Sequence, residues 1–131
     1  MYFDQKIPSK LLEKIYNFKS YHINQKTNCA TRKSSEMALE ILTSNLENLI
    51  GGSADLTGSN NTKTKELNPI TKNDFSGRYI YYGVREHAMA GAMSGISLHG
   101  GLIPYGGSFL IFTDYCKPSI RLASIMKQKI I

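Results

Sequence analysis

The first apolar residues of the chain recur at the three- and four-residue spacing of one helix face. They are Leu11, Leu12, Ile15 and Phe18. Pro8-Ser9 precedes this stripe and a polar run at 24–28 follows it, so the pattern predicts one helix between those points. Residues 1–29 are therefore expected to be a linker helix and lead-in rather than part of the core.

A second helical stripe follows directly, and it predicts a helix over about residues 31–48 with Thr31 as its N-cap. Its apolar members are Ala38, Leu42, Leu46 and Leu49. An apolar stripe of this kind needs a sheet or another helix to cover it. Residues 30–131 are expected to form one domain, which contains the sheet or helix that packs on this stripe.

The rest of the chain alternates between strand-like and helical segments. Strands are predicted at 49–50 and 78–84, and a strand followed by a turn at 102–112. Helices are predicted at 86–98 and 114–127, with Pro118 near the start of the latter, and a further strand begins at 128–131. The polar segment 57–75 reads as a long loop, and loops of that length in a compact domain are often functional.

This alternation favours an α/β fold with a mostly parallel sheet and helices on both faces. The sheet is expected to be incomplete, because the segment at 128–131 has only begun a strand. Open sheets of this class bind ligands beyond the carboxyl ends of their strands. The glycine-rich segment 51–60 and the segment 83–86 both lie at such ends, which makes them candidate parts of a site.

Composition excludes several classes of protein. With 131 residues, 41% hydrophobic and 20% charged, the chain has the profile of one folded domain. The formal charge of +6 comes from single scattered basic residues, so no nucleic-acid partner is expected, whereas attraction to phosphorylated small molecules is compatible with it. Two distant cysteines, no signal-peptide pattern and no apolar run long enough for a bilayer indicate a cytoplasmic protein without a membrane partner.

Glu86 is the most specific candidate for chemistry. It stands between Arg85 and His87 where a strand gives way to a helix. The simpler interpretation is an acid favoured by the helix dipole, worth about 0.3–1 kcal/mol, and spacing alone favours it. The alternative is a partly buried carboxyl group that holds or exchanges a proton near neutral pH.

Two further patterns leave alternatives open. Phe109, Phe112 and Tyr115 recur every three residues and either line an apolar ring or simply pack in the core. Gly91 and Gly95 weaken the helix that follows Glu86, which suggests close contact with another backbone, within the chain or in a second copy. The histidines have no metal-ligand spacing, so no metal ligand is expected in this chain.

Three segments together resemble transketolase, the thiamine diphosphate enzyme that moves a two-carbon ketol unit between sugar phosphates in the pentose phosphate pathway. They are ATRKSSEMALEIL at 30–42, LIGGSADLTGSN at 49–60, and the block from GRYIYYGVREHAM to SIRLASIMK at 77–127. The likeness covers about residues 30–131 and implies the family's pyrimidine-binding domain. Dihydroxyacetone synthase, a close relative, carries similar motifs.

The resemblance implies a role for each candidate residue. Glu86 matches the acid that hydrogen-bonds the cofactor's aminopyrimidine ring and exchanges a proton with it. Phe112, Phe109 and Tyr115 match the aromatic pocket around that ring, and Asp55 matches an acid beside the thiazolium ring. Arg32 and Ser59 match residues that hold the substrate's terminal phosphate, where a guanidinium group and a hydroxyl suit phosphate oxygens.

The family's other modules do not occur in these 131 residues. The diphosphate-binding module, through which Mg²⁺ or Ca²⁺ would bind, is expected to precede this segment, and the rest of the pyrimidine domain to follow it. The chain is therefore expected to be a fragment truncated at its C-terminus and inactive alone. One alternative is a subunit of a split transketolase, which would work as a homodimer or together with complementary chains. The other is a non-catalytic module that binds sugar phosphates or a partner.

Overall fold

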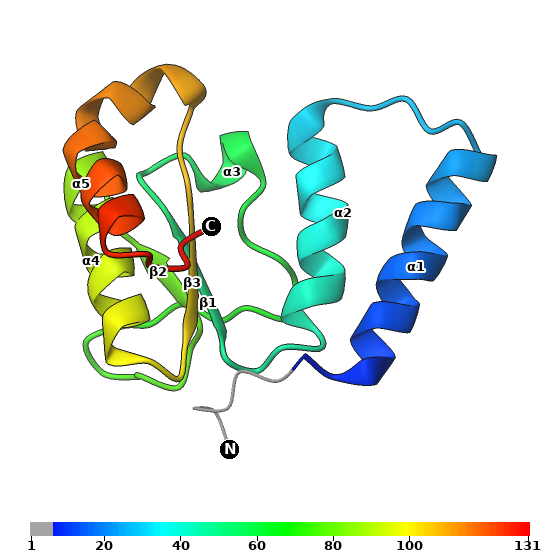
Figure 1. Cartoon of the computed structure of the whole chain (residues 1–131), viewed down its shortest axis with the longest axis horizontal. Coiled ribbons are helices and arrows are strands. Elements are labelled where there is room, and N and C mark those ends of the chain that lie inside the picture. The colour runs from blue at the N-terminus through cyan, green and yellow to red at the C-terminus, as the bar shows by residue number, and fades with distance from the viewer. Residues whose placement is uncertain (1–6) are drawn as a thin grey trace.

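The computed structural model describes residues 7–131 as a three-layer α/β arrangement (Figure 1). The elements, in order, are α1 (Ser9–Asn24), α2 (Thr31–Thr43), β1 (Leu49–Ser53), α3 (Thr57–Asn60), β2 (Tyr79–Tyr81), α4 (Glu86–His99), β3 (Ile103–Gly107), the 3-10 turn η2 (Leu110–Phe112) and α5 (Thr113–Ile125). Within the described residues, no helix is both long enough and apolar enough to cross a bilayer. Residues 1–6 of the expected lead-in lie outside the described part.

The three strands form a parallel sheet in the order β2-β1-β3, which confirms the predicted fold class. Gly51 in the central strand pairs with Tyr79 on one side and with Tyr105 on the other. Every residue of β1 is buried, as expected of a parallel strand covered on both faces. The carboxyl ends of β1 and β3 therefore lie at one edge of the sheet.

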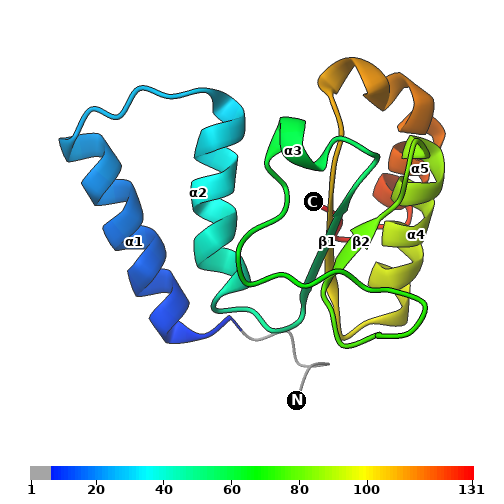
Figure 2. The same cartoon turned by 180° about the vertical axis from the view of Figure 1, so that it is seen from behind.

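Helices cover the two faces of the sheet separately, as both views show (Figures 1 and 2). On one face, α2 buries Leu39 against a cluster of Leu49, Leu67, Tyr79 and Tyr105. On the other face, α4 places Met89 and Met93, one turn apart, beside Ala54. The helix α1 packs outside α2, and its only buried residue is Leu11. On the other face, α5 packs against α4.

Several predicted boundaries differ from the structure around α2. The helix ends at Thr43 rather than near residue 48. Just beyond it, the side chains of Ser44 and Asn45 donate back to the carbonyl oxygens of Glu40 and Ile41, at 2.7 Å each. Thr31 is the first helical residue, and the N-cap position is taken by Ala30, whose side chain forms no capping bond. The prediction of Thr31 as N-cap was therefore wrong.

The later elements are shorter than predicted or differ in kind. The strand predicted at 78–84 is limited to Tyr79–Tyr81, since Gly83 turns the chain with a φ of 68°. Pro118 lies inside α5, not near its start. The segment 128–131 forms no strand, yet Ile131 exchanges two backbone hydrogen bonds with β3, to Pro104 at 3.1 Å and from Gly106 at 2.8 Å.

Gly91 and Gly95 of α4 make no close contact with another backbone segment, although their weakening of the helix suggested one. A Cβ atom at Gly95 would have no neighbour within 4 Å, and one at Gly91 would meet only the Ser119 hydroxyl at 3.9 Å. Both glycines are exposed, so the expected contact within the chain is absent from the described residues. Contact with a second copy stays a prediction.

Arg78 joins the end of α2 to the sheet, and its loss is expected to be costly. Its guanidinium group donates to the carbonyl oxygens of Leu46 at 2.7 Å and Thr43 at 3.0 Å. The variant Arg78→Ala should lower the free energy of unfolding by about 2–3 kcal/mol, because these part-buried carbonyls lose a charged donor. Urea unfolding followed by circular dichroism measures this. Arg121→Ala, at an exposed position of α5, is the control and should change stability by less than about 0.5 kcal/mol.

Candidate functional site

The predicted acid Glu86 lies at the first position of α4 and is largely withdrawn from solvent. The turn before the helix places it there: Gly83 has a left-handed backbone, and the Arg85 guanidinium group donates to the Tyr82 carbonyl oxygen at 3.0 Å. The Glu86 residue is 7% exposed. Among the described residues, none donates a hydrogen bond to its carboxyl group. The residue is thus buried, while its carboxyl group is free to bind a ligand from the cavity that it lines.

Glu86 opens into a cavity of about 670 Å³ whose opposite wall is aromatic. The lining residues are Val84, Arg85, Glu86, His87, Ala88, Phe112 and Tyr115. Phe112 ends η2, and Tyr115 follows in the first turn of α5 and is 66% exposed. The structure therefore brings together three of the residues that the sequence singled out, an acid from α4 and two rings from the segment 110–115.

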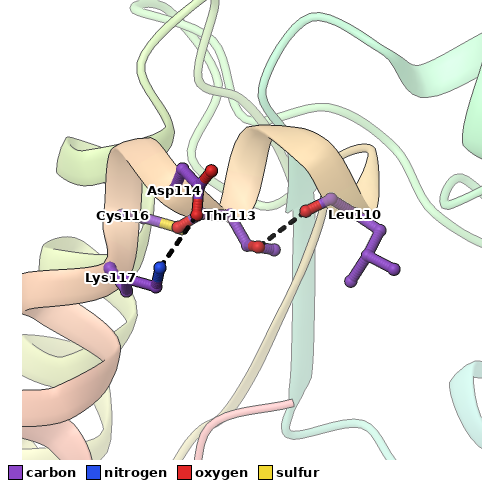
Figure 3. Close-up of polar contacts among 5 residues, drawn as sticks. All are labelled: Leu110, Thr113, Asp114, Cys116 and Lys117. Atoms are coloured by element: carbon purple, nitrogen blue, oxygen red, sulfur yellow. Dashed lines mark hydrogen bonds and ion pairs between the residues drawn. The ribbon is translucent and has the colours of Figure 1, made fainter.

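The junction between η2 and α5 fixes the direction of those rings. The Thr113 hydroxyl donates to the Leu110 carbonyl oxygen at 2.6 Å, which closes the turn, and Lys117 pairs with Asp114 on the outer surface at 3.0 Å (Figure 3). Phe112 is stacked on Phe109, with ring centroids 5.8 Å apart and an interplanar angle of 20°. Phe112 and Tyr115 lie 6.1 Å apart and tilted. The three aromatic residues thus form one continuous wall.

Cys116 lies behind this wall, close to Glu86. It is buried, and its thiol contacts the Thr113 carbonyl oxygen at 3.4 Å. Burial raises the pKa of the Cys116 thiol, and the nearby Glu86 carboxylate acts in the same direction. The thiol therefore stays neutral at physiological pH and packs as a small apolar group, without a negative charge beside Glu86.

Arg32 and Ser59 meet at a second cavity, of about 610 Å³, on the other side of the aromatic wall. Arg32 lies in the first turn of α2 and donates to the Ser59 carbonyl oxygen at 3.3 Å. Phe109, 40% exposed, also lines this cavity. Because Phe109 stacks on Phe112, the two cavities share one wall, and the predicted phosphate residues lie beside the predicted ring pocket.

Asp55 is the one candidate residue that lines neither cavity. It is exposed at the carboxyl end of β1, and its φ of 64° is left-handed. Aspartate tolerates this backbone better than most residues, although the conformation is still uncommon. Between residues 7 and 131, no group of three or more His, Cys, Asp or Glu side chains is placed to hold a metal ion.

Sequence reasoning missed the polar residues beneath the second cavity. Hydroxyl and amide groups of Ser53, Asn60, Thr62 and Tyr79 are linked there by hydrogen bonds of 2.7–3.2 Å. Ser108 lines the same cavity, and its Oγ is the one buried side-chain oxygen or nitrogen in the described part that has no partner. The glycine-rich segment 51–60 and the loop at 57–75 were the signals for this region, and they singled out neither these four residues nor Ser108.

Comparison with known proteins relates this arrangement to one family. Residues 27–131 match the family model described as "Transketolase, pyrimidine binding domain". The transketolase of Sinorhizobium medicae is 54% identical over 109 residues, which are 83% of this chain and 16% of that protein. The transketolase of Cereibacter sphaeroides is 59% identical over 97 residues, 74% of this chain and 15% of that protein.

Solved structures agree in fold as well as in sequence. A transketolase from Pichia stipitis, solved as a complex with sedoheptulose 7-phosphate, has a TM-score of 0.77 and 44% identity, over 79% of this chain and 16% of that one. Transketolase from Leishmania mexicana has a TM-score of 0.76 at the same identity and coverage. The chain spans about one sixth of the length of these relatives. This chain therefore belongs to the transketolase family, and residues 27–131 match its pyrimidine-binding domain.

Proposed function

We propose that this chain forms the pyrimidine-side wall of a thiamine diphosphate site in an enzyme that transfers a two-carbon ketol unit from a ketose phosphate to an aldose phosphate. One observation carries the proposal: Glu86 is a buried residue whose carboxyl group has no hydrogen-bond partner among the described residues and opens into a cavity walled by Phe112 and Tyr115. A planar heteroaromatic ring needs both features, an apolar face to lie against and a polar group at its edge.

The residues present fit the aminopyrimidine ring of that cofactor. Phe112 and Tyr115 offer the ring an aromatic surface, which Phe109 supports from behind by stacking on Phe112. Glu86 offers the edge of the ring a hydrogen bond. When bound, thiamine diphosphate supplies the electron sink for breaking and forming the carbon–carbon bond. Asp55, at the carboxyl end of β1, is proposed to lie on the thiazolium side.

Glu86 is proposed to hold and exchange a proton at its carboxyl oxygen. Its burial limits exchange of that proton with bulk water, which keeps the proton available to a bound ring. The carboxyl group stands in the first turn of α4 and opens into the cavity, within reach of a ring bound there.

Arg32 and Ser59 are proposed to bind the terminal phosphate of the sugar. They lie at one cavity, on two different elements, and a guanidinium group with a hydroxyl suits phosphate oxygens. The aromatic wall between the two cavities would set the distance from the sugar's phosphate to its reacting end.

Other parts of the site are proposed to come from outside this chain. The cavity at Glu86 is lined by α4, η2 and α5 on one side, and Val84 and Tyr115 are exposed at its mouth. A second copy or a complementary transketolase chain would close it, and the complementary chain would also supply the diphosphate-binding residues and their Mg²⁺ or Ca²⁺. Alone, the chain is proposed to be inactive. We place the assembled enzyme in the cytoplasm, on the pentose phosphate pathway.

A chimaeric enzyme tests this function. In the Cereibacter sphaeroides transketolase, the segment that matches residues 27–131 is replaced by this chain's residues. We expect ketol transfer that depends on added thiamine diphosphate, because every proposed contact is preserved. A chimaera that folds and assembles without activity would contradict the proposal. If the chain alone binds a sugar phosphate in calorimetry while the folded chimaera is inactive, the non-catalytic binding module is favoured instead.

A further inference from the structure

The side chain of Tyr79 reaches from the sheet to the loop that carries Ser59. Tyr79 is 0% exposed, and its ring packs in the core cluster with Leu39, Leu49 and Leu67. Its hydroxyl lies 2.8 Å from the Thr57 hydroxyl and 2.7 Å from the Thr62 hydroxyl. These two threonines flank the segment that contains Ser59. One buried phenol therefore anchors that segment at both ends.

The direction of each hydrogen bond follows from the number of protons available. The Thr62 hydroxyl donates its one proton to the Asn60 side-chain oxygen at 2.9 Å, so Tyr79 must donate to Thr62. The Thr57 hydroxyl then donates to Tyr79. Burial raises the pKa of Tyr79, which keeps its proton in place across the physiological range. The result is an ordered series from Thr57 to Asn60 with Tyr79 at its centre.

The series continues to the carboxyl ends of β1 and β3. The Asn60 amide donates to the Ser53 hydroxyl at 3.2 Å, and Ser53 donates to the Gly107 carbonyl oxygen at 3.0 Å. The other side of the loop is tied to α2, where the Asn61 amide donates to Glu36 at 3.3 Å. Ser59 lies between these attachments, which set its position relative to Arg32. Asn60 and Thr62 line the cavity together with Ser59, whereas Tyr79 and Thr57 lie outside its lining.

We propose that Tyr79 is a positioning residue whose hydroxyl holds Ser59 opposite Arg32. By doing so, Tyr79 sets the preference of this site for phosphorylated over unphosphorylated sugars. The inference rests on the proposed function. Tyr79 acts through Thr57 and Thr62 and contacts no substrate. In Tyr79→Phe the ring still fills the core, while the loop loses the bond that ties its two ends together.

The kinetic test uses the active chimaera with one ketol donor and two acceptors, D-ribose 5-phosphate and glycolaldehyde. Tyr79→Phe should raise KM for the phosphorylated acceptor about tenfold with little change in kcat, since a misplaced contact weakens binding at that end only. KM for glycolaldehyde should not change. Arg32→Ala should show the same selective loss, and Tyr82→Phe, at a half-buried tyrosine in the other core cluster, should show none.

A purely structural role would give a different result. It would lower the melting temperature and reduce activity with both acceptors alike, and that outcome would overturn the inference. Equal KM values for Tyr79→Phe and the unsubstituted chimaera with D-ribose 5-phosphate would overturn it as well. Thr57→Val, which removes one link and keeps the shape of the side chain, should reproduce part of the KM increase.

Hydrogen exchange on the full 131-residue chain provides a readout that needs no activity. The amides of Ser59 and Asn60 both bond to the Leu56 carbonyl oxygen at 2.9 Å, and they should exchange at least tenfold faster in Tyr79→Phe than in the wild type, relative to the amides of α4. Unchanged protection there would contradict the positioning role. An inactive chimaera with faster exchange in Tyr79→Phe would count against the proposed function alone.

Discussion

The Glu86→Gln variant of the chimaeric transketolase is expected to lose thiamine diphosphate-dependent activity by roughly 100- to 10,000-fold. Glutamine keeps the size of the side chain and its hydrogen-bonding oxygen, but it cannot take up and return a proton. Because the residue is only 7% exposed, water does not readily replace its carboxyl group. Initial rates at saturating cofactor measure the loss, and Glu66→Gln, at an exposed position of the polar loop, is the matched control.

The same variant separates the two interpretations of Glu86. If the residue only complements the helix dipole, Glu86→Gln should cost about 0.3–1 kcal/mol of stability and leave the rate almost unchanged. If it handles a proton, the rate should fall while the melting temperature stays close to that of the control. A variant with full activity and reduced stability would therefore contradict the proposed role.

Gly51→Ala is expected to destabilise the fold by about 3 kcal/mol. A Cβ atom there would overlap Cζ of the Tyr105 ring. The ring cannot swing away, because Tyr105 is buried and its hydroxyl donates to the Thr62 carbonyl oxygen at 2.6 Å. Urea unfolding of the 131-residue chain measures the change.

Gly95→Ala is the matched control, and the sign of its effect should be opposite. A Cβ atom at Gly95 meets nothing within 4 Å, and alanine favours the helix by up to about 1 kcal/mol over glycine. The variant should therefore unfold at a higher urea concentration than the wild type. If Gly51→Ala proved as stable as Gly95→Ala, the close packing of Tyr105 on the central strand would be wrong.

The fold could be predicted where periodicity and burial agree. The strand at Leu49–Ser53 and the helix at Glu86–His99 begin where the pattern places them, because each is bounded by a sharp change in composition. The end of α2 could not be predicted, since Ser44 and Asn45 bond back to its carbonyls while Leu46 still packs against the core from outside the helix. Hydrophobic spacing does not distinguish a helix that continues through Leu46 from one that ends before it.

The site was predictable in its residues but not in its arrangement. Sequence motifs singled out Glu86 and the aromatic residues, and separately Arg32 and Ser59, yet only the fold places them at two cavities that share the Phe109–Phe112 stack. Tyr79 carried no signal, because a tyrosine in a strand is ordinary and its hydroxyl partners lie far away in the sequence. Such a contact is a property of the folded chain alone.

The order of strands in the sheet also determines how the chain can fold. The central strand β1 comes first in the sequence, and its partners for Gly51 are Tyr79 and then Tyr105. Neither β2 nor β3 is joined to β1 by a short turn. A long loop must therefore close before β1 can form hydrogen bonds with either strand. Folding should therefore begin in the local helical contacts of α4 and α5, and β1, the best-buried strand of the native protein, should acquire its partners late.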